Sequence, residues 1–180
     1  MKMKKLLAAA GALCLAVTLG ACQLFNPTEG RLNDTMHTMF FDFTVTGAYL
    51  AEEYEGYQPA EGNQLLVADI TVKNTFRESI EMYDTDFQAQ WGEDEDPEAY
   101  SIPITTDPET FTELEPVGGD QLPGTYPLAV DEERSGQLVY EVPQGYVDFS
   151  LSYLELYDDG SEEENTGDTY FVFFTAQDAP

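Results

Sequence analysis

The chain has 180 residues, and its 35 acidic and 7 basic side chains give a formal net charge of −28. A surface this acidic repels nucleic acid and anionic lipid, because both of them recruit basic patches. The composition therefore excludes a nucleic-acid-binding protein and favours a neutral, cationic or metal-bridged partner, although excess acid also serves solubility alone.

The first 21 residues predict an export signal. Lys2, Lys4 and Lys5 precede an apolar run over residues 6–19, and small residues follow up to Cys22. A basic start, a short apolar run and a small-residue exit are typical of a secretory signal. Even counted to Cys22, the stretch from Leu6 has 17 residues, at the lower limit for a membrane-spanning helix, so we expect cleavage rather than an uncleaved anchor.

Leu19-Gly20-Ala21-Cys22 resembles the end of a bacterial lipoprotein signal: a branched aliphatic residue, two small residues and a cysteine. The resemblance implies that Cys22 is lipidated and becomes the mature N-terminus on the extracytoplasmic face of the cell membrane. Two acyl chains would provide the stable anchoring that one chain does not. An ordinary cleaved signal is the alternative, but its small-x-small site is not well formed before Cys22.

The predicted mature chain has no free thiol, because Cys14 leaves with the signal and Cys22 carries lipid. Its net charge is 4 basic minus 35 acidic residues, which equals −31. About 150 residues are enough for one domain with a core that needs no disulfide. We expect a signal over residues 1–21, a short tether over 22–37 and one domain over 38–177.

Period-2 alternation of apolar and polar residues dominates that domain and predicts β-strands. In chain order, the expected elements cover residues 39–46, 64–73, 80–91 with a turn at 84–86, an edge strand at 100–104, a long connection over 107–124, a weak strand at 126–130 and a last strand at 170–175, covered on both faces. No segment has a helical period.

The clearest hairpin is predicted over residues 136–157. Pro143-Gln144-Gly145 would form its turn, because a three-residue loop that ends in glycine suits a type I turn followed by a left-handed residue. The apolar parity changes after Tyr153 to Leu154 and Leu156, which indicates a bulge. Short strands with Gly/Pro turns at this spacing predict an all-β, immunoglobulin-like β-sandwich of seven to nine strands.

Two blocks carry a family resemblance: residues 62–74, followed by Asp86-Phe87, and residues 136–143, followed by Gly145. They resemble the telokin-like, immunoglobulin-like domain of unknown function found in many bacterial lipoproteins, over about residues 40–175. The resemblance implies an immunoglobulin-like sandwich in an extracytoplasmic setting. It brings no catalytic residues.

The sequence offers little for catalysis. His37 is the only histidine, no Gly-x-Ser-x-Gly elbow is present, and a multi-histidine zinc site is excluded by count. We therefore expect no enzyme, and we assign no catalytic, cofactor-binding or metal-binding residue. A carboxylate-based hydrolase remains the less favoured alternative, since 35 acids make any single pair uninformative.

Calcium binding is the more serious alternative. Asp94 and Asp96 lie in one acidic loop, and Asp158, Asp159 and residues 162–164 lie in another. Clustered carboxylates are the ligands that Ca²⁺ prefers, although neither loop has the EF-hand spacing. The expected function is a non-catalytic binding module, anchored in the bilayer through Cys22. It would contact an unknown envelope protein or a neutral glycan through exposed tyrosines and Trp91.

Overall fold

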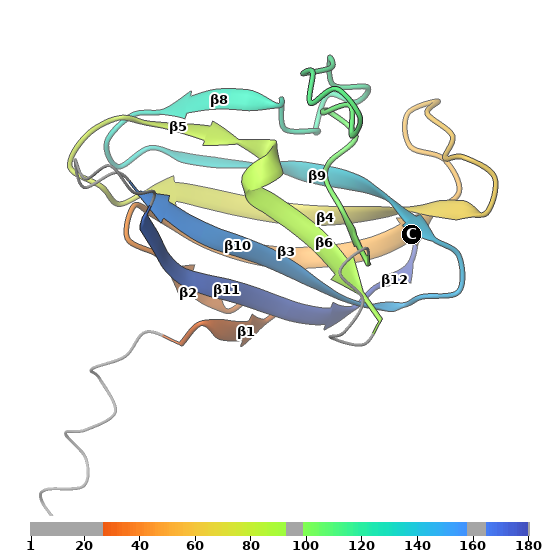
Figure 1. Cartoon of the computed structure of the whole chain (residues 1–180), viewed down its shortest axis with the longest axis horizontal. Helices are drawn as coiled ribbons and strands as arrows, with labels where there is room; N and C mark the ends of the chain where they lie inside the picture. Colours follow the sequence, from red (N-terminus) through yellow and green to blue (C-terminus); the bar gives the residue numbers. More distant parts are fainter. Residues whose placement is uncertain (1–26, 93–98, 158–164, 180) are drawn as a thin grey trace, which may run out of the picture.

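Two stacked β-sheets form the body of the protein (Figure 1). The structure is a computed structural model and describes residues 27–92, 99–157 and 165–179. Sheet A has the strand order β1 (Glu29–Arg31), β11 (Asn165–Thr175), β10 (Asp148–Tyr157), β6 (Phe87–Trp91) and β7 (Tyr100–Ser101). Sheet B has the order β12 (Gln177–Asp178), β3 (Phe41–Ala51), β4 (Asn63–Asn74) and β9 (Glu133–Pro143), with β2 (Thr35–His37) also paired to β3. A third sheet pairs β5 (Ile80–Tyr83) with β8 (Thr125–Leu128), and the 3-10 turn η1 (Asp84–Asp86) joins β5 to β6.

The predicted immunoglobulin-like β-sandwich is confirmed. Of the twelve strands in the described residues, eight have four or more residues, within the predicted seven to nine. The other four, β1, β2, β7 and β12, have two or three residues each and lie at sheet edges. A strand of two or three residues is too short to show an alternation of apolar and polar side chains in the sequence.

The core between the sheets is aromatic. Alternation on β3 turns Phe41 and Phe43 inward, where they meet Phe87 from β6 and Tyr153 from β10. Their rings contact edge to face, with centroids 4.8 Å apart for Phe41 and Tyr153 and 5.3 Å apart for Phe43 and Phe87. This geometry adds to the stabilisation from apolar burial, because a positive ring edge meets a negative ring face.

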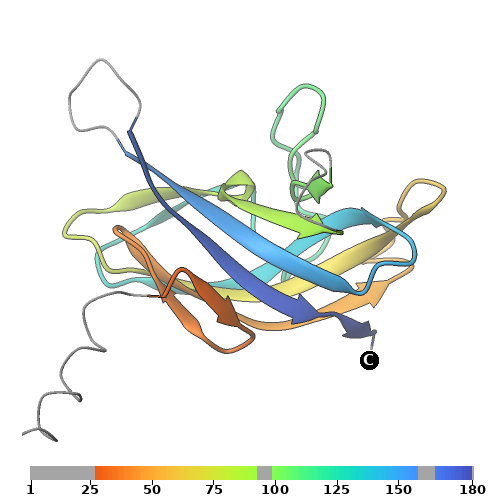
Figure 2. The same cartoon turned by 60° about the horizontal axis from the view of Figure 1, so that its bottom comes forward.

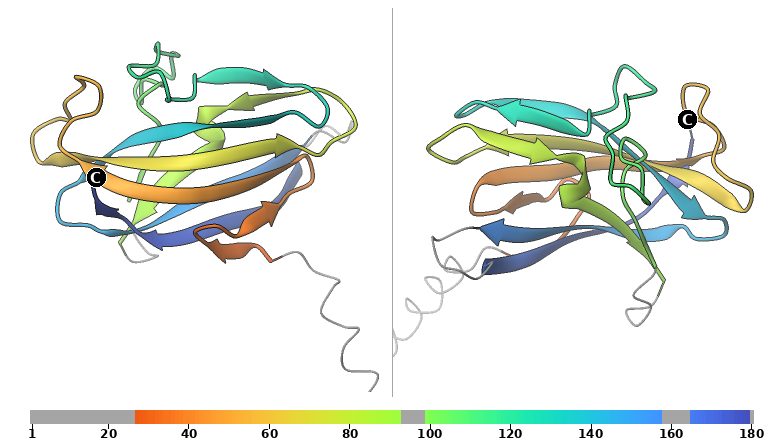
Figure 3. Two further views of the ribbon diagram at one scale, coloured as in Figure 1. Left: turned by 180° about the vertical axis from the view of Figure 1, so that it is seen from behind. Right: turned by 45° about the horizontal axis from the view of Figure 1, so that its top comes forward.

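The central strand β4 is buried on both faces. Its inward side chains join the core as predicted, while Leu65 and Val67 point out of sheet B and pack with Tyr54 and Val139. The loop 52–62 reaches Tyr54 over this outer face, and Figure 3 shows the loop at one end of β3 and β4 from behind. The Tyr54 hydroxyl donates to Gln137 Oε1 at 2.8 Å, which fixes the loop to β9.

The hairpin predicted over residues 136–157 is wrong. β9 pairs with β4 in sheet B along its whole length, and β10 pairs with β6 and β11 in sheet A. The turn at 143–145 therefore carries the chain from one sheet to the other. Gly145 has the predicted left-handed conformation, with a φ of +93°. The left-handed glycine is confirmed, but it does not determine which strands pair.

Part of the segment predicted as a tether belongs to the sandwich. β1 pairs in parallel with β11, and β2 pairs with β3, so residues 29–37 are strand or tight turn. The export signal and Cys22 lie outside the described residues. Across those residues, no helix has the length and apolarity to cross a membrane.

A bulge in β10 lies where it was predicted, but Leu154 and Leu156 point outward instead of into the core. The register with β11 shifts between Leu154 and Leu156, and both leucines are exposed, at 44% and 52%. The inward residue is Glu155, which is only 4% exposed. Its Oε1 accepts the Met39 N–H at 2.7 Å and its Oε2 accepts the Asp168 N–H at 3.3 Å. Glu155 thereby joins the β2–β3 connection of sheet B to sheet A.

We expect the Glu155→Gln substitution to lower the free energy of unfolding by about 2 kcal/mol. The amide keeps one acceptor oxygen and replaces the other with a donor, so one partly buried backbone N–H loses its acceptor. Urea denaturation at neutral pH measures this change. Glu133→Gln, at an exposed position of β9, is the matched control; an equal loss in both variants would contradict the role of Glu155.

Candidate binding groove on the outer face of sheet A

The outer face of sheet A carries an open groove of about 960 Å³. It follows from strand alternation: Phe149 and Leu151 of β10 point into the core, and Ser150 between them points outward. On β11, Val172 points inward, and Phe171 and Phe173 on either side of it point outward. In this way short side chains lie on one strand and long ones lie on the next.

Two rows of paired residues cross the sheet; the whole first row and the Glu29–Phe171 end of the second line the groove. The first row runs across five strands, in the order Arg31, Phe173, Ser150, Gln90 and Tyr100. The second row runs across four strands, in the order Glu29, Phe171, Ser152 and Gln88. Neighbouring strands are about 5 Å apart, so residues opposite one another contact directly. Ser150 of β10 forms the floor, and the longer side chains on either side of it form the two walls.

One wall is aromatic. The rings of Phe171 and Phe173 stack with centroids 5.9 Å apart and an angle of 20° between their planes. The guanidinium of Arg31 lies 5.2 Å from the centre of the Phe173 ring, a cation–π distance. These contacts hold the two rings side by side at the β11 edge of the groove.

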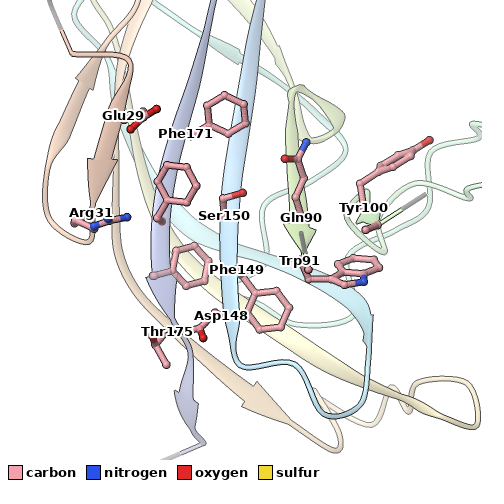
Figure 4. Close-up of a pocket in the computed structure, with 14 residues that line it drawn as sticks. Glu29, Arg31, Gln90, Trp91, Tyr100, Asp148, Phe149, Ser150, Phe171 and Thr175 are labelled. Atoms are coloured by element: carbon pink, nitrogen blue, oxygen red, sulfur yellow. Dashed lines mark hydrogen bonds between the residues drawn. The ribbon is translucent and has the colours of Figure 1, made fainter. Parts of the chain in front are cut away.

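The opposite wall is polar, with one exposed aromatic ring. In Figure 4, Ser150 lies between Phe171 and Gln90, and Tyr100 lies beyond Gln90. Tyr100 is 48% exposed. Trp91 closes the lower end of this wall and lies 6.4 Å from the Tyr146 ring. The groove thus combines aromatic faces with hydroxyl and amide groups that both donate and accept hydrogen bonds.

The sequence prediction of exposed tyrosines and Trp91 as contact residues is met in the groove by Trp91 and Tyr100 alone. The prediction that residues 170–175 are covered on both faces is wrong for Phe171 and Phe173, which line the groove. Their exposure follows from the short side chains of the neighbouring strand, which periodicity within β11 itself does not reveal.

The residues considered for chemistry lie elsewhere. His37 is half exposed on β2, with its Nδ1 2.9 Å from Asp42 Oδ1. Both acidic loops considered for calcium lie outside the described residues. Within the described ranges, no group of three His, Cys, Asp or Glu side chains is placed to hold a metal ion.

A second cluster of titratable groups lies inside the protein, at the turn η1. Asp84 is buried and accepts hydrogen bonds from the hydroxyls of Thr105 and Thr106. Burial raises the pKa of Asp84 to about 6, and burial raises the pKa of Asp86 to about 6 as well. The fully buried Tyr140 donates its hydroxyl proton to the Phe87 carbonyl at 3.1 Å. These bonds fix η1 to the connection after β7 and the start of β6 to β9, which gives the cluster a structural role.

The fold and the groove define the class: an immunoglobulin-like sandwich with a ligand-sized groove on one sheet face. The chain belongs to the family described as "Domain of unknown function (DUF4352)", which matches residues 30–164. A search of curated proteins finds no match.

The solved structures that match this chain share little of its sequence. The "putative lipoprotein" YcdA of Bacillus subtilis is 19% identical with a TM-score of 0.48; the match covers 76% of this chain and only 37% of that one. The YjhA protein of Bacillus subtilis is 17% identical with a TM-score of 0.45, and 69% and 79% of the two chains are covered. An uncharacterised β-sandwich protein of Clostridium difficile is 14% identical with a TM-score of 0.43, and 82% and 93% are covered.

Proposed function

We propose that this protein is a lipoprotein of the extracytoplasmic membrane face, and that its sandwich is a non-catalytic module that binds a neutral glycan in the groove of sheet A. The observation that carries the ligand class is the five-strand row from Arg31 to Tyr100, which places aromatic, hydroxyl and amide groups across one open face. The telokin-like designation from the sequence resemblance remains a prediction.

The composition of the groove favours a sugar chain. The C–H faces of a pyranose ring pack on aromatic rings, and its hydroxyl groups pair with amides and serine hydroxyls. An anionic chain would be repelled by a molecule with a net charge of −28. The open shape suits a polymer that lies across the strands better than a small molecule that needs enclosure.

The position of the groove is compatible with an anchor at Cys22. The Thr28 carbonyl accepts the Phe171 N–H at 2.8 Å, so the described chain begins beside the aromatic wall. The segment from Cys22 to Pro27 spans at most about 18 Å when fully extended. A lipidated protein would therefore hold the groove close to the membrane, where it would meet envelope polymers rather than distant ones.

We expect the mature lipoprotein in detergent to bind at least one of the neutral hexasaccharides of glucose, xylose and mannose in isothermal titration calorimetry. Phe173→Ala and Gln90→Ala should each weaken that binding at least tenfold, because each removes one wall contact. Tyr83→Ala is the control, since Tyr83 is an exposed tyrosine of β5 outside the groove.

Two outcomes would contradict the glycan proposal. One is the absence of binding to all three sugars by a protein with a native circular dichroism spectrum. The other is the capture of a protein partner that still binds in the presence of a chelator and no longer binds the Phe173→Ala variant. That second result would assign the same groove to an envelope protein instead.

A further inference from the structure

The connection between β7 and β8 carries the most exposed large apolar residue in the described part of the chain. Phe111 is 71% exposed, and Leu114 and Val117 follow it on the same segment, each more than two-fifths exposed. Figure 2 shows this connection as the green loop that stands away from the two sheets. Exposed aromatic rings at the tips of ordered loops are typical anchors of protein interfaces.

The loop holds Phe111 in a defined position. Asp107 Oδ1 accepts the N–H groups of Glu109 and Thr110 at 2.9 and 2.8 Å. The Phe111 N–H donates to the Asp107 carbonyl at 2.8 Å, and the Leu114 N–H donates to the Thr105 carbonyl at 2.8 Å. These bonds close a tight turn that ends at Phe111, and so reduce the entropy that binding would otherwise cost.

The backbone at Phe111 is strained. Its φ is +53°, in the left-handed region, which a bulky side chain rarely adopts and which glycine or asparagine adopts easily. A strained backbone of this kind costs on the order of 1–3 kcal/mol. Folding stability alone would favour a different residue there, because the Phe111 ring is mostly in water and gains little from burial.

The segment that carries Phe111 has charged side chains of one sign. Residues 107–124 include five acids and no lysine or arginine: Asp107, Glu109, Glu113, Glu115 and Asp120. Backbone and side-chain hydrogen bonds from Thr110 lower the pKa of Asp107, so the acid at the base of the turn stays ionised. An apolar anchor with acidic neighbours complements a partner that has an apolar pocket with a basic rim.

We propose that Phe111 is the anchor of a protein-docking site for a cationic partner protein. The inference goes beyond the glycan groove and does not depend on it, because it uses a different segment and a convex rather than a concave surface. A bilayer is disfavoured as the occupant, since the five acids would be repelled by anionic lipid headgroups. The exposed ring fits a pocket, and the acids would steer a basic rim toward it.

The test replaces Phe111 by the photo-crosslinker p-benzoylphenylalanine in the full-length protein and irradiates intact cells that express it. We expect one discrete adduct to a protein with an excess of Lys and Arg, identified by mass spectrometry. The adduct should fall at least tenfold in 0.5 M NaCl and in the doubly neutralised variant Glu109→Gln with Glu115→Gln. The control variant, Glu78→Gln with Glu133→Gln, removes the same charge elsewhere and should leave the adduct unchanged.

The same crosslinker at Tyr83 should give no such adduct. With the partner purified, Phe111→Ala should weaken binding at least thirtyfold, while binding of neutral hexasaccharides stays unchanged. The proposal would be overturned by no discrete adduct at position 111, by a partner without basic excess, or by an adduct that is insensitive to salt and to the two glutamates. None of these results bears on the groove of sheet A.

Discussion

Replacing Cys22 by Ser is expected to remove the protein from the detergent-rich phase of a phase-partitioned cell lysate. The proposed anchor depends on one sulfur atom, which would carry the diacylglycerol after cleavage behind Ala21. Two acyl chains bury enough methylene groups for stable anchoring, and a serine hydroxyl at this position cannot form the thioether. Intact-mass spectrometry should show the lipid mass on the wild-type protein and its absence from Cys22→Ser.

Cys14→Ser is the matched control, because Cys14 lies within the apolar run and would be removed with the signal. This variant should match the wild type in both mass and partitioning. A Cys22→Ser protein that kept the wild-type mass and remained as firmly in the membrane fraction would contradict the lipoprotein assignment. A mature protein of unmodified mass that begins after another residue would support the ordinary cleaved signal instead.

The sequence predicted the long strands, because each has one face in the core. Leu66, Ala68, Ile70 and Val72 alternate along β4 and are all buried as expected. The pairing of β9 with β10 could not be predicted in the same way. Two alternating segments around a left-handed glycine fit a hairpin and a sheet-to-sheet corner equally well, since alternation records burial and not the strand partner.

The candidate groove was harder to predict than the fold. Its floor and walls come from residues that are adjacent only across strands, such as Phe173, Ser150 and Gln90, which lie on β11, β10 and β6. Within β11, Phe171 and Phe173 look like ordinary second-face core residues. Only the register shows that short serines lie next to them and leave the space open. Glu155 was missed because the two apolar side chains beside it, Leu154 and Leu156, predicted a change of parity, whereas the inward parity of Phe149, Leu151 and Tyr153 continues to Glu155.

The pH dependence of stability should depend on Asp84. Burial raises the pKa of Asp84 to about 6 from an ordinary value of 3.8, and the bonds from Thr105 and Thr106 only partly oppose that effect. The folded state therefore binds this proton more tightly than the unfolded chain does. The resulting stabilisation is fully present below about pH 4 and is lost as the pH rises through about 6. A pKa difference of about two units corresponds to about 3 kcal/mol.

We expect the free energy of unfolding of the wild type to fall by about 3 kcal/mol more than that of Asp84→Asn between pH 4 and pH 7.5. The amide side chain of this variant cannot ionise, so its desolvation cost does not change over this range. Urea titrations in 0.5 M NaCl measure the difference, because the salt screens the general repulsion among surface acids. Glu115→Gln removes the same charge from an exposed site, and its free energy of unfolding should change with pH as that of the wild type does. Equal slopes in the wild type and Asp84→Asn would show that the buried carboxyl keeps an ordinary pKa in the folded protein. The pH response would then come from surface charge alone.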